Sequence, residues 1–261
     1  MHLAMMKTNA EFFIDIGHEV MESIRESRES GEIKGTIGMG ADGTTTSVLD
    51  QLCEDIIIGR ITENDLPYNI VSEEIGKIER GYEQNLVIDP LDGTFNAENE
   101  IPLYSMSVAI MGDYFNSLNE ALIMNLSNGS YYYAKKGAGA FKNSKKITVS
   151  KKRRNAYIIS SGSVKEIPDY LKFAEGRFRI LGCASLEMSL VAEGVFDLMA
   201  YIGEKKAIRN VDIAASTLLL REAGGQVLNE KLEDLNMGLS LLEKSQVIAV
   251  SNEKLLESRR R

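Results

Sequence analysis

The chain has 261 residues, of which 44% are hydrophobic, and a formal net charge of −8 at pH 7. This length can bury a sizeable core, as one large domain or two packed halves, and the acidic balance argues against a general nucleic-acid binder, which needs clustered Lys and Arg. No stretch approaches the roughly 18 apolar residues of a membrane span. The two cysteines, Cys53 and Cys183, suggest neither a disulfide framework nor a cysteine-rich zinc site. We therefore expect a cytoplasmic protein.

The first 61 residues predict two helices separated by a glycine-rich segment. Apolar residues recur at helical spacing from residue 9 to residue 30, which predicts an amphipathic helix that ends near Gly31. The segment that follows, up to Thr46, holds four glycines. We interpret it as a mobile loop, with a β-hairpin as the more common alternative. Residues 47 to 61 predict a second helix with Asp50 in its first turn.

Carboxylates follow two predicted strands. The strand at residues 69–72 runs into Glu73 and Glu74, and the short apolar run at residues 86–88 leads to Asp89 at a turn. Adjacent glutamates alone are usually part of a solvated acidic loop. A functional interpretation depends on the other acidic residues that accompany them.

The turn after Asp89 has a composition that suits a divalent metal ion and a phosphate. Pro90 has no N–H and disfavours helix at the preceding residue, whereas Gly93 permits close backbone approach. Asp92 adds a second carboxylate. A helix that begins at Thr94 would leave unpaired N–H groups facing a bound anion, although Thr94 could be only a helix cap.

The rest of the chain predicts antiparallel strands and then α/β alternation. Strands are predicted at residues 104–111, 120–125, 130–134, 157–160, 179–181, 198–201, 226–228 and 247–251, and helices at residues 165–173, 185–194 and 212–223. The last helix begins at Asp212 and ends at Gly224 and Gly225. Asp212 alone would most simply be an N-cap.

Four of these carboxylates, Glu73, Asp89, Asp92 and Asp212, match the oxygen ligands that Mg²⁺ prefers, and no histidine lies near them in the sequence. A site that binds both a metal ion and a phosphate suits hydrolysis of a phosphate monoester, and an enzyme must accelerate that reaction by as much as about 10²¹-fold. One general acid or base supplies only about 10² to 10⁴. Two metal ions roughly 3.5 to 4 Å apart can activate water and stabilise the leaving oxygen.

Other phosphatase chemistries lack their residues in this chain. A cysteine nucleophile requires an arginine six positions later, but Gly59 follows Cys53 and Ser189 follows Cys183 at that spacing. The two histidines lie in the N-terminal segment and in the first predicted helix. LDGT resembles the DxDGT motif of aspartate-nucleophile enzymes, but Pro90 stands where the nucleophile would be. Direct attack by water remains.

Three ordered signatures make the chain resemble the inositol monophosphatase and fructose-1,6-bisphosphatase superfamily, and in particular its archaeal-type dual-activity members. They are SEEIG at residues 72–76, DPLDGTFN at residues 89–96, and VDIAAS at residues 211–216 running on to REAGG at residues 221–225. The similar layout begins at the GADGTTTSVLD stretch that ends at Asp50. The resemblance implies a layered α/β fold, an alternating αβαβα sandwich of the sugar-phosphatase type. It implies a single phosphatase unit, with residues 1–150 as the metal- and phosphate-binding half and residues 151–261 as the substrate-side half.

By position, the resemblance also implies metal sites for Mg²⁺, in which Mn²⁺ can substitute. Glu73, Asp89 and the carbonyl group of Leu91 would bind the first ion. Asp92 and Asp212 would join Asp89 at the second.

The implied catalytic residues are Glu73, Thr94 and Asp50. Glu73 and Thr94 would orient the attacking water, which hydrolyses the ester without a covalent intermediate. Asp50 matches a family acid near a weaker third metal ion. The backbone N–H groups of Gly93 and Thr94 would hold phosphate oxygens at a helix start.

The implied substrate contacts are Asp92, Gly93, Thr94, Gly182, Ala184, Ser185 and Arg209. Arg209 could recognise a second phosphate, but a surface cluster with Lys205 and Lys206 is at least as good an interpretation. The chain departs from common family patterns after DPLDG, at residues 94–97, and at Val211 before the late aspartate. These departures leave the shape of the substrate pocket open.

We therefore expect a Mg²⁺-dependent phosphomonoesterase acting on inositol 1-phosphate, fructose 1,6-bisphosphate or both. The alternatives are a phosphatase for NADP or a 3′(2′),5′-bisphosphate nucleotide, and a non-enzymatic regulatory protein on the same fold. The expected partner is a small phosphorylated substrate, with no nucleic acid or membrane. A homodimer is a family-level expectation.

Overall fold

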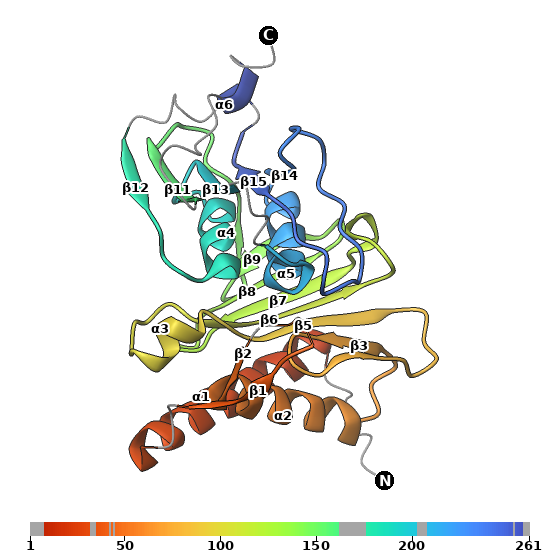
Figure 1. Cartoon of the computed structure of the whole chain (residues 1–261). Helices are drawn as coiled ribbons and strands as arrows, with labels where there is room; N and C mark the ends of the chain where they lie inside the picture. Colours follow the sequence, from red (N-terminus) through yellow and green to blue (C-terminus); the bar gives the residue numbers. More distant parts are fainter. Residues whose placement is uncertain are drawn as a thin grey trace.

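The computed structural model describes residues 8–31, 35–41, 43, 45–161, 176–202, 208–252 and 254–257. These residues form alternating layers of helices and sheets (Figure 1). Helices α1 (Asn9–Ser30) and α2 (Val48–Glu63) pack on one face of an eight-stranded sheet, and α4 (Ala184–Ala192) and α5 (Asn210–Glu222) lie between that sheet and a five-stranded one. The short helix α6 (Lys254–Glu257) packs against the outer face of the second sheet through Leu256. The predicted layered α/β fold is confirmed.

The larger sheet has the strand order β10-β9-β8-β7-β6-β5-β3-β4, and only its β3–β5 pair is parallel. Its strands are β3 (Asn69–Ser72), β4 (Gly76–Ile78), β5 (Asn85–Asp92), β6 (Ser105–Met111), β7 (Glu120–Asn125), β8 (Tyr131–Lys135), β9 (Gly139–Lys142) and β10 (Lys145–Ile147). Both faces are covered. Leu86 and Ile88 pack towards α1 and α2, whereas Val87 packs towards α4 and α5, as the two-residue period of a strand requires.

The smaller sheet has the order β12-β11-β13-β15-β14. Its strands are β12 (Arg177–Arg179), β11 (Ala156–Ser161), β13 (Leu198–Ile202), β15 (Val247–Val250) and β14 (Gln226–Leu228). Strand β11 runs parallel to both of its neighbours, and β15 is antiparallel to β13 and β14. This mixed sheet forms the last large layer over α4 and α5, as the predicted α/β alternation of the second half requires.

Most predicted elements are confirmed within a few residues. Helix α1 ends at Gly31, which adopts a left-handed conformation with φ of 79°. In the glycine-rich segment, β1 (Thr36–Met39) and β2 (Thr45–Ser47) pair in antiparallel fashion, so the hairpin alternative is correct. The strand predicted at residues 179–181 is misplaced, because β12 begins two residues earlier. The helix predicted at residues 165–173 lies outside the described residues.

The strand that carries Asp89 is longer than predicted. β5 does not end in a turn at Asp89 but continues through Pro90 to Asp92, and its register against β6 shifts between these two aspartates. Such a bulge tolerates a residue that cannot donate to the strand ladder. The α3 helix (Thr94–Glu98) then starts at Thr94 as predicted, and a single 3₁₀ turn follows later, at Phe115–Ser117.

Strands β4, β9 and β10 have no counterpart in the sequence prediction. Each is only three or four residues long, and lysines and glycines occupy much of their length, so they lack a clear apolar alternation. None of the described helices combines the length and apolar character needed to cross a membrane.

Candidate active site

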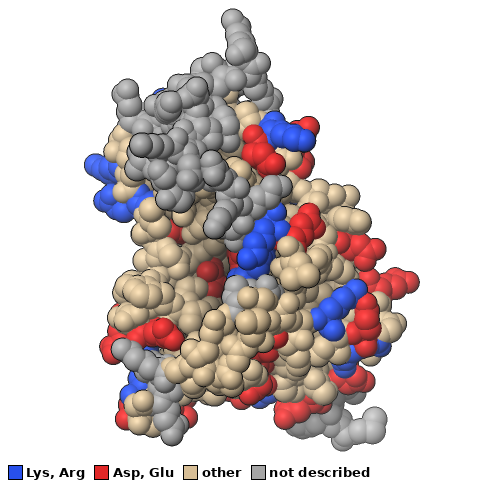
Figure 2. Space-filling model, in the orientation of Figure 1, with Lys and Arg blue, Asp and Glu red and all other residues tan. Residues whose placement is uncertain are grey.

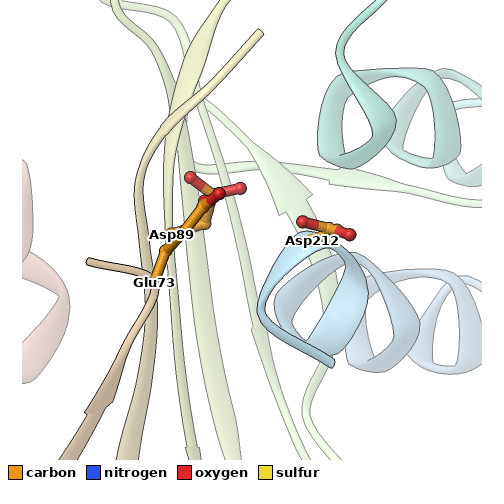
Figure 3. A group of neighbouring side chains, drawn as sticks. All are labelled: Glu73, Asp89 and Asp212. Atoms are coloured by element: carbon orange, nitrogen blue, oxygen red, sulfur yellow. The ribbon is translucent and has the colours of Figure 1, made fainter. Parts of the chain in front are cut away.

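Three carboxylates from different elements meet beside the larger sheet: Glu73 follows β3, Asp89 lies in β5, and Asp212 is the third residue of α5 (Figure 3). One ligand oxygen from each lies within 4.8 Å of the others. Because β3 and β5 are parallel, with Ser72 opposite Ile88, the residues that follow these two come side by side. Helix α5 then brings its N-terminal turn to the same place. Among the described residues, no other three His, Cys, Asp or Glu side chains come together in this way.

Burial makes this cluster costly without a cation. Asp89 is only 1% exposed, and its pKa is raised well above its ordinary value. Burial is the main cause, and repulsion from Glu73 is the next largest. Burial also raises the pKa of Glu73 to about 8, although Arg209 opposes the shift. Carboxylate oxygens held close together in a poorly solvated site suit a hard divalent cation, which would favour their charged forms. The residues present therefore fit the metal that the sequence predicts.

Arg209 lies inside the carboxylate cluster. Its Nη1 is 2.6 Å from Glu73 Oε1, and its Nη2 is 2.7 Å from Asp212 Oδ1. Its backbone N–H also donates to Asp212 Oδ2 at 2.7 Å, at the start of α5. The Arg209 side chain is only 13% exposed, so the surface-cluster interpretation is wrong for this residue. Lys205 and Lys206 lie outside the described residues.

Asp92 is not one of the three clustered carboxylates, and it contacts the start of α4. Its Oδ2 accepts hydrogen bonds from the backbone N–H and the hydroxyl of Ser185, both at 2.6 Å, and its Oδ1 accepts one from the N–H of Ala184 at 3.2 Å. The Cys183 thiol also donates to Oδ2 at 3.2 Å. Asp92 therefore connects the DPLDGTFN motif to the residues predicted to contact substrate. Its role at a second metal ion stays a prediction, as does that of the buried Leu91.

Thr94 and Asp50 form a hydrogen-bonded pair at the edge of the cluster. The Thr94 hydroxyl lies 2.8 Å from Asp50 Oδ1 and 3.2 Å from the Leu91 carbonyl oxygen. Asp50 Oδ2 accepts the backbone N–H of Ser47 at 3.0 Å, in the capping box of α2. Asp50 thus holds the Thr94 hydroxyl while its own position is fixed by the helix start. The helix-cap interpretation of Thr94 is wrong, because Gly93 holds the N-cap position of α3 and no side chain caps that helix.

A cleft of about 550 Å³ opens over these groups. Asp50, Glu73 and Thr94 line it, together with parts of the β1–β2 hairpin and the α3 segment. Figure 2 shows acidic side chains, in red, at the base of a hollow in the displayed face, with a basic side chain beside them. The glycine-rich hairpin therefore forms one wall of a space large enough for a small phosphorylated molecule.

The predicted substrate residues Gly182, Ala184 and Ser185 lie against the same motif. Asn96 Nδ2 donates to the carbonyl oxygens of Leu103 and Leu181, each at 2.7 Å. Gly93, with φ of 89°, approaches so closely that an added Cβ would lie 3.1 Å from the Gly182 carbonyl oxygen. The DPLDGTFN segment and the start of α4 are therefore packed directly together.

Three supporting residues were not predicted: Asn96, Glu54 and Glu187. Glu187 accepts the N–H groups of Leu181 and Gly182 at 2.5 and 3.1 Å, and Glu54 accepts hydrogen bonds around the Glu73 turn. Both glutamates are almost fully buried on largely apolar helices. The sequence does carry a signal for these two glutamates, because each stands at an apolar position of a predicted helix. A glutamate at such a position is buried and must accept hydrogen bonds from buried donors.

The layers and the clustered carboxylates define the class: an α/β protein with a buried acidic site suited to a divalent metal ion. The chain belongs to the inositol monophosphatase family, whose profile it matches over residues 5–261. It is similar to a fructose-1,6-bisphosphatase/inositol-1-monophosphatase of Methanothermobacter thermautotrophicus, with 35% identity over 247 residues that cover 88% of this chain and 86% of the relative.

Two further comparisons bear on the site. A crystal structure of an inositol monophosphatase-fructose 1,6-bisphosphatase matches with a TM-score of 0.85 and 30% identity, covering 96% of this chain and 98% of that chain. A bifunctional NADP phosphatase/NAD kinase of Methanococcus maripaludis is 32% identical over 276 residues, which cover 94% of this chain but 47% of that protein. The chain therefore spans about half the length of the second relative.

Proposed function

We propose that this chain, a phosphoric monoester hydrolase of the inositol monophosphatase family, releases phosphate from small sugar or polyol phosphates. Inositol 1-phosphate and fructose 1,6-bisphosphate are the proposed substrates, singly or both. The observation that carries the proposal is the buried convergence of Glu73, Asp89 and Asp212, beside a cleft of suitable size. The M. thermautotrophicus relative, whose name carries both activities, supports the choice of substrates.

The proposed cofactor is Mg²⁺, with two or three ions per active site and Mn²⁺ as a substitute. Glu73, Asp89 and Asp212 would hold it, joined by the Leu91 carbonyl and Asp92. When bound, Mg²⁺ would neutralise phosphoryl oxygens and lower the pKa of nearby water. Small oxygen-ligated Mg²⁺ suits this donor set, because the clustered side chains offer carboxylates and no sulfur or imidazole.

The chain's own groups would orient the attacking water. The Thr94 hydroxyl donates a hydrogen bond to Asp50, so its oxygen lone pairs are available to accept a hydrogen bond from water. In its ionised form, Glu73 provides a second acceptor at the edge of the same cleft. Two acceptors fix the water's orientation, and the N–H groups of Gly93 and Thr94 would hold phosphate oxygens. Attack by water needs no covalent intermediate.

Substrate positioning would fall to Arg209 and the residues at the start of α4. Gly182, Ala184 and Ser185 lie beside the DPLDGTFN motif, where they can contact the organic part of the ester. Arg209 is a candidate for a phosphate contact, because its guanidinium group already lies next to Glu73 and Asp212. Both proposed halves of the unit contribute, since residues 1–150 carry Glu73 and residues 151–261 carry Asp212.

The test is Mg²⁺-dependent phosphate release by wild type and by Asp89→Asn and Asp212→Asn variants, with EDTA arms. Each substitution removes one cluster carboxylate with little change in shape, so turnover should collapse. Asp197→Asn is the matched control, because Asp197 is also buried but accepts the backbone N–H groups of Arg154 and Asn155 instead. Its Mg²⁺-dependent turnover should survive. Unchanged turnover in a folded Asp89→Asn or Asp212→Asn protein would contradict the metal assignment.

NADP is the second candidate substrate, and the similarity to the M. maripaludis NADP phosphatase/NAD kinase favours it. A phosphate-release screen should compare inositol 1-phosphate, fructose 1,6-bisphosphate, NADP and 3′-phosphoadenosine 5′-phosphate at equal concentrations. A higher kcat/KM for either nucleotide than for the sugar phosphates would replace the sugar-phosphate assignment.

We also propose that the protein works in the cytoplasm and that it is a homodimer. Sizing chromatography tests the homodimer.

A further inference from the structure

We propose that Glu54 is a positioning residue for the metal site, because it holds the turn that carries Glu73. The inference rests on the proposed metal-dependent function and deepens it. Among the described residues, Glu54 makes no hydrogen bond to the clustered carboxylates or to the proposed substrate contacts. It acts through the backbone on either side of Glu73.

The contacts of Glu54 surround Glu73 in the sequence. One oxygen, Oε1, accepts the Ser72 hydroxyl at 2.5 Å, the Glu74 N–H at 3.2 Å and the Ile75 N–H at 3.1 Å. Glu54 itself is 2% exposed. The residue before Glu73 and the two after it are therefore fixed to a single buried atom, which restricts where the Glu73 side chain can start.

Helix α2 connects this contact to the Thr94 pair. Asp50 and Glu54 are four residues apart, so they lie on one face of α2, about 6 Å apart along its axis. Asp50 holds the Thr94 hydroxyl, and Glu54 holds the Glu73 turn. One turn of α2 thus sets the separation of the Thr94 hydroxyl and the Glu73 carboxylate, the two groups proposed to orient the attacking water. The same helix is anchored in the core by buried Leu49, Cys53, Ile57 and Ile61.

A purely structural role and a positioning role predict different results. If Glu54 only satisfies buried donors, its loss lowers stability and leaves the metal site of the folded protein intact. If it positions Glu73, its loss also weakens metal binding, because residues that orient metal ligands affect affinity by about 10- to 100-fold. Metal affinity measured on folded protein separates the two.

The experiment compares Glu54→Ala, Glu54→Gln and a matched control, Glu120→Ala, by calorimetric titration with Mg²⁺ and by thermal unfolding. Glu120 is also a buried glutamate, but it accepts hydrogen bonds from Tyr133 and Asn9 at 2.6 and 3.1 Å. It pairs with Ile110 of β6, three residues along that strand from Ser107, the partner of Asp89. We expect Glu54→Ala to lose about 10- to 100-fold in Mg²⁺ affinity. Glu54→Gln keeps an acceptor oxygen and should lose less than about 10-fold. Glu120→Ala should keep wild-type affinity whatever its melting temperature.

Wild-type affinity in folded Glu54→Ala, or an equal loss of affinity in Glu120→Ala, would overturn the inference. If Glu54→Ala does not fold, Ser72→Ala decides, since it removes one of the three donors and leaves the backbone intact. Reduced Mg²⁺ affinity in Ser72→Ala supports the inference, and unchanged affinity overturns it. Wild-type protein that binds no Mg²⁺ would instead refute the proposed metal site, on which the inference depends.

Discussion

Replacing Arg209 by glutamine should destabilise the metal-free protein strongly. The substitution removes the guanidinium group that contacts Glu73 at 2.6 Å and Asp212 at 2.7 Å. The three side chains are 13%, 15% and 10% exposed, so the carboxylates left behind would be poorly solvated and would repel each other and Asp89. Arg209 therefore acts as an internal counter-ion for the cluster.

The size of the effect follows from burial. Removing one partner of a buried ion pair typically costs about 3 to 5 kcal/mol. Proton uptake by Glu73 or Asp89 relieves part of the repulsion, so the lower end, about 3 kcal/mol, is expected here. At roughly 2 to 4 °C per kcal/mol for a chain of this size, the melting temperature should fall by about 6 to 12 °C.

The assay is thermal unfolding in EDTA and in Mg²⁺, with Arg60→Gln as the control. Arg60 pairs with Glu19 at 3.1 Å, but both side chains are more than a third exposed, so its loss should cost at most about 1 kcal/mol. Mg²⁺ should raise the melting temperature of Arg209→Gln more than that of wild type, because the ion supplies the missing positive charge. A melting temperature of Arg209→Gln in EDTA equal to that of wild type would refute the counter-ion reasoning.

Two further predictions follow from the same site. The pKa of Glu73 is raised from 4.5 to about 8, so Glu73 binds its proton more tightly in the folded state than in the unfolded state. Protonated Glu73 therefore adds to the free energy of unfolding. This contribution is complete below pH of about 4.5 and is lost as pH rises through about 8. The melting temperature in EDTA should accordingly fall across this range, and Glu73→Gln should flatten the profile; a wild-type profile that rises with pH would contradict this sign. Gly93→Ala should lose about 1 to 2 kcal/mol from its positive φ, and should also raise KM by displacing the segment at Gly182. Gly31→Ala, which has positive φ but no heavy atom within 4 Å of the added Cβ, should lose stability with KM unchanged, and equal KM values in the two variants would count against the displacement.

The sequence predicts the helices and most strands well because their signals are local. The apolar spacing of α1 and α2 involves neighbouring residues only, as does the glycine stop after α1. The positions of Glu73, Asp89 and Asp212 in one cluster required the family resemblance, since their elements are far apart in the chain. Arg209 could not be placed from sequence, because its partners depend on how α5 docks on the sheet.

The bulge at Pro90, between the two aspartates of DPLDGTFN, decides which face of the sheet each aspartate points to. In a regular strand, residues three apart point to opposite faces, so Asp89 and Asp92 would be separated by the sheet. The bulge changes this: Asp89 pairs with Ser107 and Asp92 with Ser105, so three steps on β5 match two on β6. Both aspartates consequently face α4 and α5, where one joins Asp212 and the other binds the start of α4. The bulge at Pro90, a residue that cannot extend a strand ladder, thus lets one short motif contact both the carboxylate cluster and the start of α4.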